Sequence, residues 1–196
     1  MRATYFKSNS LDIFILVCFK NGKDTQEVVI LDEIRFFWKE ADVIAYIENN
    51  DLEKYDSKLL TNQAVVSDLI KMIQGYLNGD KINLYDNIKN LNIGLSFNEK
   101  FPTDFSQKVM NIVSQLKYGE LTSYSSIGQK INSKAYRAIG TVLSKNPIPL
   151  IIPCHRVLGK KGIGGFMGKT DDGEEISLKK KLLKIEGVVE YKIPTL

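Results

Sequence analysis

The sequence predicts an α/β protein of two domains, a small N-terminal α/β domain over residues 1–98 and a mainly helical C-terminal domain with a helix-turn-helix over residues 99–196. Runs of β-branched and aromatic residues dominate the first half, whereas apolar residues at helical spacing dominate the second. The balance of charge also changes sign between the halves. At 196 residues, the chain is long enough for two small domains, each with its own core.

The net charge of the chain changes sign near residue 98. Residues 1–98 carry 11 Lys and Arg against 14 Asp and Glu, and residues 99–196 carry 16 against 9. Residues 121–170 contain eight basic residues and no carboxylate. Such a surface suits a polyanion, because no acidic group on it repels phosphates. A merely basic, solvated face fits equally well, so charge alone leaves nucleic acid binding open.

Composition excludes several other classes. No apolar run reaches the roughly 18 residues of a membrane helix, and the first residues lack the apolar block of a signal peptide. Two cysteines do not make a disulfide scaffold, which predicts a cytoplasmic protein, associated with the nucleoid if the cell is prokaryotic. Two cysteines and one histidine are too few ligands for a plausible zinc site, so no metal is expected.

The N-terminal half is expected to form a small sheet with helices. Asn21-Gly22 is a hairpin turn signal after the first apolar run. Cys18 lies inside that run, where a buried, inert thiol is expected. The expected elements are strands at 12–19, 27–31 and 34–38, helices at 41–47 and 64–77, and a polar connector at 86–100.

The C-terminal half is expected to be mainly helical. Asp104 and Gln107 form a capping-box pair for an entry helix that ends at Gly119. A final helix is expected from a cap at Ser177 to Ile185.

Two short helices at 124–131 and 134–144, the first capped by Thr122 or Ser123, make a helix-turn-helix candidate. A plain helical hairpin also fits this pattern. The DNA interpretation is favoured by small residues that allow close approach to a groove and by one arginine among them: Ala135, Ala138, Gly140 and Arg137.

A thiol followed by an imidazole is the candidate reactive group. The apolar run 147–153 is predicted to be a buried strand that leads to Cys154 and His155, the only histidine. A thiol attacks as its thiolate, so it needs a base. Neighbours on a strand point to opposite faces, so a bend or a bridging water is required, and Glu186 is a candidate to orient the imidazole. The residues alone fit a buried structural cysteine equally well.

The segment from Phe101 to Gly187 resembles the O6-alkylguanine-DNA alkyltransferase family, the methylated-DNA–protein-cysteine methyltransferases. The strongest match is Ile152-Pro153-Cys154-His155-Arg156-Val157, which is similar to the family's signature around its alkyl-accepting cysteine. Further similar blocks follow in order and at fitting spacing at 105–109, 119–124, 137–140, 146–149, 162–166 and 182–187.

The resemblance implies direct-reversal DNA repair. One irreversible displacement would move the alkyl group from O6-alkylguanine in duplex DNA to Cys154, without a cofactor, in a monomer that is consumed by the reaction. The damaged base would be flipped out of the helix. The resemblance also implies a ribonuclease H-like N-terminal domain.

The same resemblance assigns roles to single residues. His155 would take the thiol proton through a water with Glu186 behind it, Asn146 would brace the site, and Tyr124 would donate a proton to the leaving guanine. Arg137 would fill the gap left by the flipped base. The other expected DNA contacts are Ser123, Tyr124, Ala135, Tyr136, Ala138 and Gly140. The expected substrate pocket consists of Pro149, Val157, Gly165, Phe166 and Met167, with Met167 where many relatives have a serine.

Parts of the sequence are also compatible with three other functions, each of which is less favoured. A non-catalytic lesion sensor related to this family replaces the cysteine, so Cys154 argues against it. A transcription regulator needs base-reading side chains, and Ala135, Ala138 and Gly140 are poor readers. A general cysteine hydrolase lacks a second histidine, and nothing in the sequence defines a carbonyl substrate.

Overall fold

A computed structural model describes residues 1–22, 29–54, 63–96, 100–160 and 162–191. The chain divides into two compact units, Met1–Phe97 and Asn98–Leu196, and each is described by itself.

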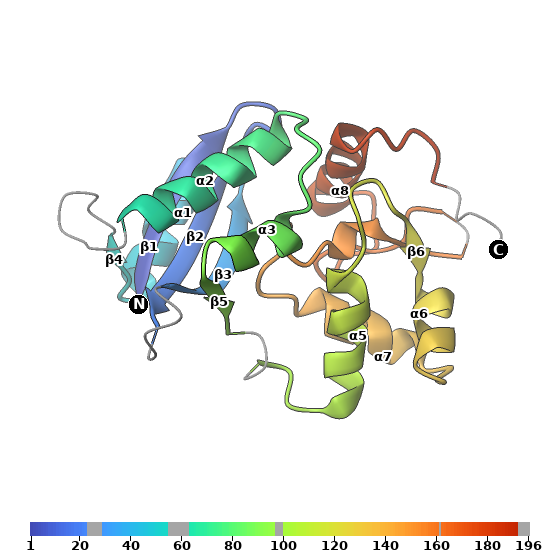
Figure 1. Cartoon of the computed structure of the whole chain (residues 1–196). Helices are drawn as coiled ribbons and strands as arrows, with labels where there is room; N and C mark the ends of the chain where they lie inside the picture. Colours follow the sequence, from blue (N-terminus) through green and yellow to red (C-terminus); the bar gives the residue numbers. More distant parts are fainter. Residues whose placement is uncertain (23–28, 55–62, 97–99, 161, 192–196) are drawn as a thin grey trace. The chain divides into compact units, whose positions relative to one another are not determined.

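The N-terminal unit is built on a five-stranded sheet in the order β4-β1-β2-β3-β5 (Figure 1). The three long strands are antiparallel neighbours, while β4 and β5 add to the edges in parallel. The strands are β1 (Arg2–Ser8), β2 (Ile13–Asn21), β3 (Val29–Phe37), β4 (Glu53–Lys54) and β5 (Ile93–Leu95). The helices are α1 (Glu40–Asn49), α2 (Gln63–Leu77) and α3 (Leu84–Asn90).

Helices pack on both faces of this sheet, which explains why β2 is apolar almost throughout. On one face, Val43 of α1 packs with Leu16 and Cys18. Phe19 points to the other face, as the alternation along a strand requires, and packs with Val66 of α2. Cys18 has no exposed surface, as expected for a structural thiol.

Several sequence predictions for this unit need correction. The two strands expected at 27–31 and 34–38 form one continuous β3, and residues 27 and 28 lie outside the described part of the chain. Asn21 still belongs to β2 and pairs with Val29, so the turn does not lie at Asn21-Gly22. The expected connector at 86–100 contains most of α3 and all of β5, because Ile88 and Ile93 supply a buried apolar face.

The C-terminal unit is mainly helical, as predicted. Its helices are α5 (Asp104–Ser114), α6 (Tyr124–Lys130), α7 (Tyr136–Ser144) and α8 (Glu174–Ile185), with a 3-10 turn η1 (Cys154–Arg156). Two short strands, β6 (Thr122–Ser123) and β7 (Val157–Leu158), pair in parallel and join the start of α6 to the segment after η1.

The helix starts differ in detail from the prediction. Thr103, not Asp104, caps α5, and its hydroxyl accepts the backbone N–H of Ser106. Ser123 caps α6 in the same way, as one of the two expected candidates. The final helix begins after Gly173, so Ser177 lies inside it.

The run 147–153 is not a strand, which corrects the prediction for the most important segment of the chain. Three prolines remove backbone donors that a strand would need: Pro147, Pro149 and Pro153. Leu150 has a left-handed backbone (φ 74°), and the N–H of Ile152 donates to the carbonyl of Ile148. The apolar side chains are buried because this turn fills the core of the unit.

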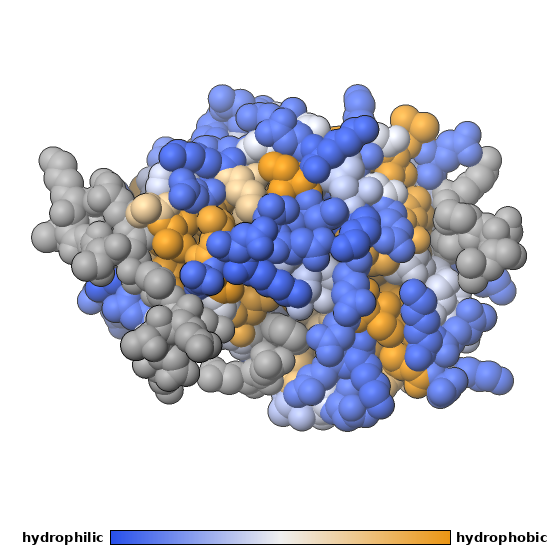
Figure 2. All heavy atoms as spheres, in the orientation of Figure 1, coloured by the Kyte–Doolittle hydropathy of each residue, from blue (hydrophilic) through white to orange (hydrophobic). Residues whose placement is uncertain are grey.

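Hydrophilic residues cover much of the face drawn in Figure 2, with smaller hydrophobic areas between them. In the described ranges, no helix combines the length and hydrophobicity needed to cross a membrane.

Candidate active site

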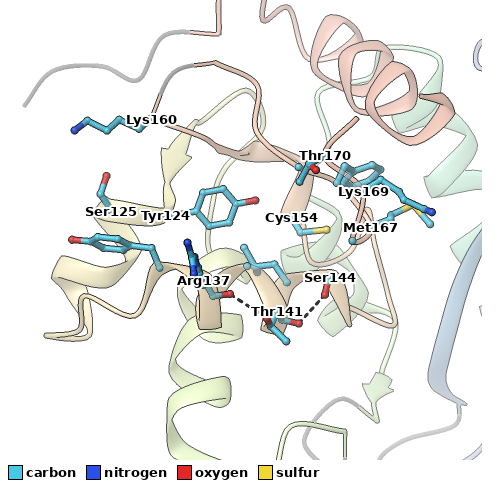
Figure 3. Close-up of a pocket in the computed structure, with 16 residues that line it drawn as sticks. Tyr124, Ser125, Arg137, Thr141, Ser144, Cys154, Lys160, Met167, Lys169 and Thr170 are labelled. Carbon is cyan, nitrogen blue, oxygen red and sulfur yellow. Dashed lines mark hydrogen bonds between the residues drawn. The ribbon is translucent and has the colours of Figure 1, made fainter. Parts of the chain in front are cut away.

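Cys154 borders a cavity of about 540 Å³ in the C-terminal unit (Figure 3). The cavity lies between α6, α7 and the glycine-rich segment before α8, and Cys154 is only 7% exposed. In Figure 3 the sulfur points toward the side of the cavity that carries Met167 and Thr170. The lining residues include Tyr124, Ser125, Tyr136, Arg137, Gly140, Thr141, Ser144, Cys154, Lys160, Gly165, Phe166, Met167, Lys169 and Thr170.

The turn before Cys154 is held by the side chain of Asn146. The Nδ2 group of Asn146 donates to the carbonyl of Ile152 at 2.8 Å and to Sγ of Cys154 at 3.2 Å. Its Oδ1 accepts the N–H of Ile148 at 3.2 Å. One amide therefore replaces the backbone partners that the prolines cannot provide, and it fixes the sulfur at the same time.

Burial raises the pKa of the Cys154 thiol, and the Asn146 hydrogen bond, the charge of Lys179 and nearby backbone N–H groups oppose that shift. The net direction is upward, so the resting group is a thiol at neutral pH. A reaction at this sulfur therefore needs a base to take the proton.

His155 is completely buried and paired with Glu186. Its Nε2 lies 3.0 Å from Oε1 of Glu186. Successive residues of a 3-10 turn point about 120° apart, so Cys154 faces the cavity while His155 faces the carboxylate. The opposite-face geometry expected from a strand is therefore wrong, although the two side chains still diverge.

Arg156 is the second partner of Glu186. Its Nε donates to both carboxylate oxygens at 3.0 Å, and its Nη2 donates to Oε1 at 2.6 Å. Its Nη1 donates to the carbonyl of Leu116 at 2.6 Å. The N–H of Gly119 also donates to Glu186 at 3.3 Å. Gly119 has a φ of 72°, and its missing side chain allows this close approach.

These contacts fix the charges of the buried pair. Burial alone would raise the pKa of Glu186, but His155 and Arg156 outweigh it and hold that pKa well below its usual range. Burial lowers the pKa of His155, against the opposing effect of Glu186. At neutral pH the carboxylate is therefore ionised and the imidazole neutral. With Nε2–H donated to Glu186, a proton would be accepted by Nδ1.

Tyr124 and Arg137 stand on the opposite side of the cavity from the glycine-rich segment. In Figure 3 the hydroxyl of Tyr124 points toward Cys154, and Arg137 extends from α7 toward the Tyr124 ring. Burial and the nearby Cys154 raise the pKa of Tyr124, so it keeps its proton. A Cβ at Gly140 would lie 3.7 Å from the Tyr124 ring, in ordinary contact.

The structure brings most of the predicted site residues together. Tyr124, Tyr136, Arg137, Gly140, Gly165, Phe166 and Met167 line the cavity with Cys154. Ala135 and Ala138 are exposed at the start of α7 but do not line it. Ser123 is buried and its hydroxyl caps α6, so it does not present a surface for DNA.

Two predicted pocket residues lie behind the cavity. Pro149 and Val157 are buried and are not among the residues that line it. The carbonyl of Val157 accepts a 2.6 Å hydrogen bond from Nζ of Lys179.

Sequence reasoning missed Arg156 and Lys179 as site residues. Arg156 was counted among the basic residues of a polyanion surface, but it is 3% exposed and bound to Glu186. Lys179 lies two helical turns before Glu186 on α8, on the face that buries Ile176 and Leu183. This spacing was the available signal, but three consecutive lysines at 179–181 obscured it.

The comparisons with known proteins agree on one family. Residues 104–188 match the family model described as "6-O-methylguanine DNA methyltransferase, DNA binding domain". The methylated-DNA–protein-cysteine methyltransferase of Metallosphaera sedula is 33% identical over 141 residues, which cover 72% of this chain and 79% of that protein. The protein of the same name from Archaeoglobus fulgidus is 45% identical over 86 residues, 44% of this chain and 58% of that protein.

A solved structure shares the fold along nearly the whole chain. The OGT of Mycobacterium tuberculosis in complex with DNA has a TM-score of 0.62 and 22% sequence identity. The match covers 95% of this chain and 92% of that one. It supports the mixed α/β architecture of the chain.

Fold and site together define a class of protein. In this class a buried cysteine borders a cavity beside two short helices and is followed by a histidine paired with a carboxylate. The matches then identify the family. The chain belongs to the methylated-DNA–protein-cysteine methyltransferases.

Proposed function

We propose that this protein repairs alkylated DNA by direct reversal, taking the alkyl group of O6-alkylguanine onto Cys154. The observation that carries the proposal is the placement of Cys154, whose sulfur borders the cavity and is held by Asn146. The family membership and the names of the relatives support the same reaction. One acceptor cysteine takes up one lesion, so a monomer is sufficient.

In the proposed reaction, the sulfur attacks the alkyl carbon as the bond from that carbon to guanine O6 breaks. The thiol proton passes through a water to Nδ1 of His155, where ionised Glu186 stabilises the resulting imidazolium. Tyr124 donates a proton to the guanine, which leaves as a neutral base, and Tyr124 recovers its proton from solvent. The thioether that forms is stable, so each chain reacts once.

We also propose that α6 and α7 form a helix-turn-helix that binds duplex DNA, and that the N-terminal unit is ribonuclease H-like. The first turn of α7 is exposed from Ala135 to Ala138, and small side chains there allow close approach to a groove. Lys160, Lys169 and Arg137 supply positive charge around the cavity without a carboxylate. A flipped guanine would enter between Tyr124 and Phe166.

The direct test is a mass measurement. After incubation with duplex DNA that contains O6-methylguanine, the peptide with Cys154 is expected to gain the mass of one methyl group in exchange for hydrogen. The peptide with Cys18 is the internal control and is expected to stay unchanged. An unmodified Cys154 peptide after long incubation would contradict the proposed function.

Replacing Arg137 with alanine is expected to slow repair of duplex DNA more than reaction with the free O6-methylguanine base. The guanidinium fills the gap in the duplex, and the free base leaves no gap. Lys134→Ala is the matched control, because Lys134 is also exposed and its loss removes the same charge. The ratio of the duplex rate to the free-base rate is expected to fall for Arg137→Ala alone. A similar fall in both variants would indicate a phosphate contact instead.

A further inference from the structure

Residues 163–165, called here the wall, form a glycine-rich edge of the cavity that has few side chains with which to hold its shape. Gly164 has a φ of 71°, and a Cβ there would lie 2.7 Å from the backbone nitrogen of Gly159. A Cβ at Gly165 would lie 2.8 Å from the carbonyl of Lys169. The backbone is folded closely on itself, so the wall depends on backbone hydrogen bonds for its position.

Lys179 supplies such bonds from α8. Its Nζ donates to the carbonyls of Val157 at 2.6 Å, Ile163 at 2.7 Å and Gly165 at 2.9 Å. An ammonium has three protons, and three carbonyls receive them. The carbonyls of Ile163 and Gly165 belong to the wall. The carbonyl of Val157 follows the 3-10 turn η1 that carries Cys154, called here the acceptor turn.

The charge of Lys179 is unusual in this place. The side chain has no exposed surface, and a lysine is seldom fully buried unless its charge is compensated. Burial lowers the pKa of Lys179 to about 8, while the nearby Cys154 opposes that shift. The fold therefore keeps an ammonium that is costly to bury at a point where the wall and the acceptor turn meet.

We propose that Lys179 is a positioning residue, whose ammonium fixes the 163–165 wall to the acceptor turn and so sets the place of the guanine relative to Cys154. Gly165 itself lines the cavity, and Phe166 and Met167 follow it directly. Loss of the ammonium leaves three backbone carbonyls, one buried and two partly buried, without this donor. The wall then moves, and the alkyl carbon is no longer aligned with the sulfur.

The kinetic test uses Lys179→Met, which keeps the length of the side chain and removes its donors, and it rests on the proposed function. Repair of a methylated duplex is expected to fall about 100-fold, the scale of a misplacement of about 1 Å. Iodoacetamide alkylates the sulfur without being positioned by the wall, so its rate reports only the fraction of Cys154 that is thiolate. Its rate at Cys154 is expected to fall by no more than about tenfold, the effect of one pKa unit.

The controls separate positioning from folding and from charge. Lys179→Gln keeps two amide donors and is expected to react at an intermediate rate. Lys180→Met removes only an exposed bridge to Asp172 and is expected to match the unaltered protein. Equal falls with duplex and with iodoacetamide would overturn the proposal in favour of a charge effect. Unchanged repair by folded Lys179→Met would also overturn it.

Hydrogen exchange tests the same contact without any repair chemistry. Backbone amides of 162–169 are expected to exchange faster in Lys179→Met or Lys179→Gln than in Lys180→Met, with the amides of α5 unchanged. Equal exchange in all three variants would overturn the proposal. Absence of methyl transfer by the unaltered protein would instead refute the proposed function, and the exchange result would still decide the role of Lys179.

Discussion

Cys154→Ala is expected to take up no methyl group from O6-methylguanine DNA while still binding the duplex. The sulfur is the only atom of the side chain that can form the new bond, so its loss abolishes the reaction rather than slowing it. The residues on the Arg137 side of the cavity keep their positions, so binding of the duplex is expected to persist. The measurement pairs peptide mass with DNA binding by fluorescence anisotropy.

Cys18→Ala is the matched control for this variant. Cys18 is fully buried in the N-terminal sheet, so this substitution costs some stability but leaves methyl uptake at Cys154 intact. Methyl transfer to Cys18, or uptake that persists in Cys154→Ala, would contradict the assignment of the acceptor.

Glu186→Gln is expected to combine a large loss of stability with a slower reaction. The neutral amide leaves the buried Arg156 guanidinium without a counter-charge, and breaking a buried ion pair in this way costs about 3–5 kcal/mol. The amide also no longer stabilises a protonated His155, so methyl transfer slows. Urea unfolding of the C-terminal unit and single-turnover kinetics measure the two effects.

The pH dependence gives a second measure of the same pair. The pKa of Glu186 is held below its ordinary value of 4.5, so its contribution to stability is present above about pH 4.5 and is lost as pH falls further. In this range the unfolded chain binds the extra proton. His155, with its lowered pKa, adds a loss in the same direction that begins near pH 6.5.

The unaltered protein is therefore expected to lose stability on acidification below pH 4.5 more steeply than Glu186→Gln does. Glu174→Gln is the control, because Glu174 is exposed in the first turn of α8. A surface change of this kind stays within about 0.5 kcal/mol. Parallel pH profiles for the unaltered protein and Glu186→Gln would contradict the assigned direction of the Glu186 shift.

The sequence was sufficient to locate the reactive group and its neighbours. Cys154, His155 and Glu186 were identified by type and spacing, and the structure places the last two 3.0 Å apart. The helices at 64–77 and 124–131 were also predicted, because their apolar residues repeat with the helical period.

The conformation of the acceptor segment could not be predicted in the same way. An apolar run with β-branched residues favours a strand, and only tertiary contacts reveal that Asn146 supplies the partners of a turn. The prolines were the contrary evidence, since three of them in seven residues do not suit a central strand.

Lys179 illustrates a different limit of prediction from the sequence. A lysine among lysines on a charged helix resembles a solvated residue, and its burial depends on carbonyls that lie 14 to 22 residues earlier in the chain. Local periodicity can indicate which face of α8 is buried. It does not indicate that three backbone carbonyls lie there in position to accept hydrogen bonds from an ammonium.

The pairing of His155 with Glu186 spans 31 residues of sequence and ends at the C-cap of α8, the last described helix. Contacts of this range form only after the intervening loop has closed, and that closure has an entropic cost. During synthesis, Cys154 and His155 join the chain before Glu186, the residue that orients the imidazole. If the proposed reaction is correct, Cys154 would become competent only after α8 has docked, and an incomplete chain would not use up its single turnover.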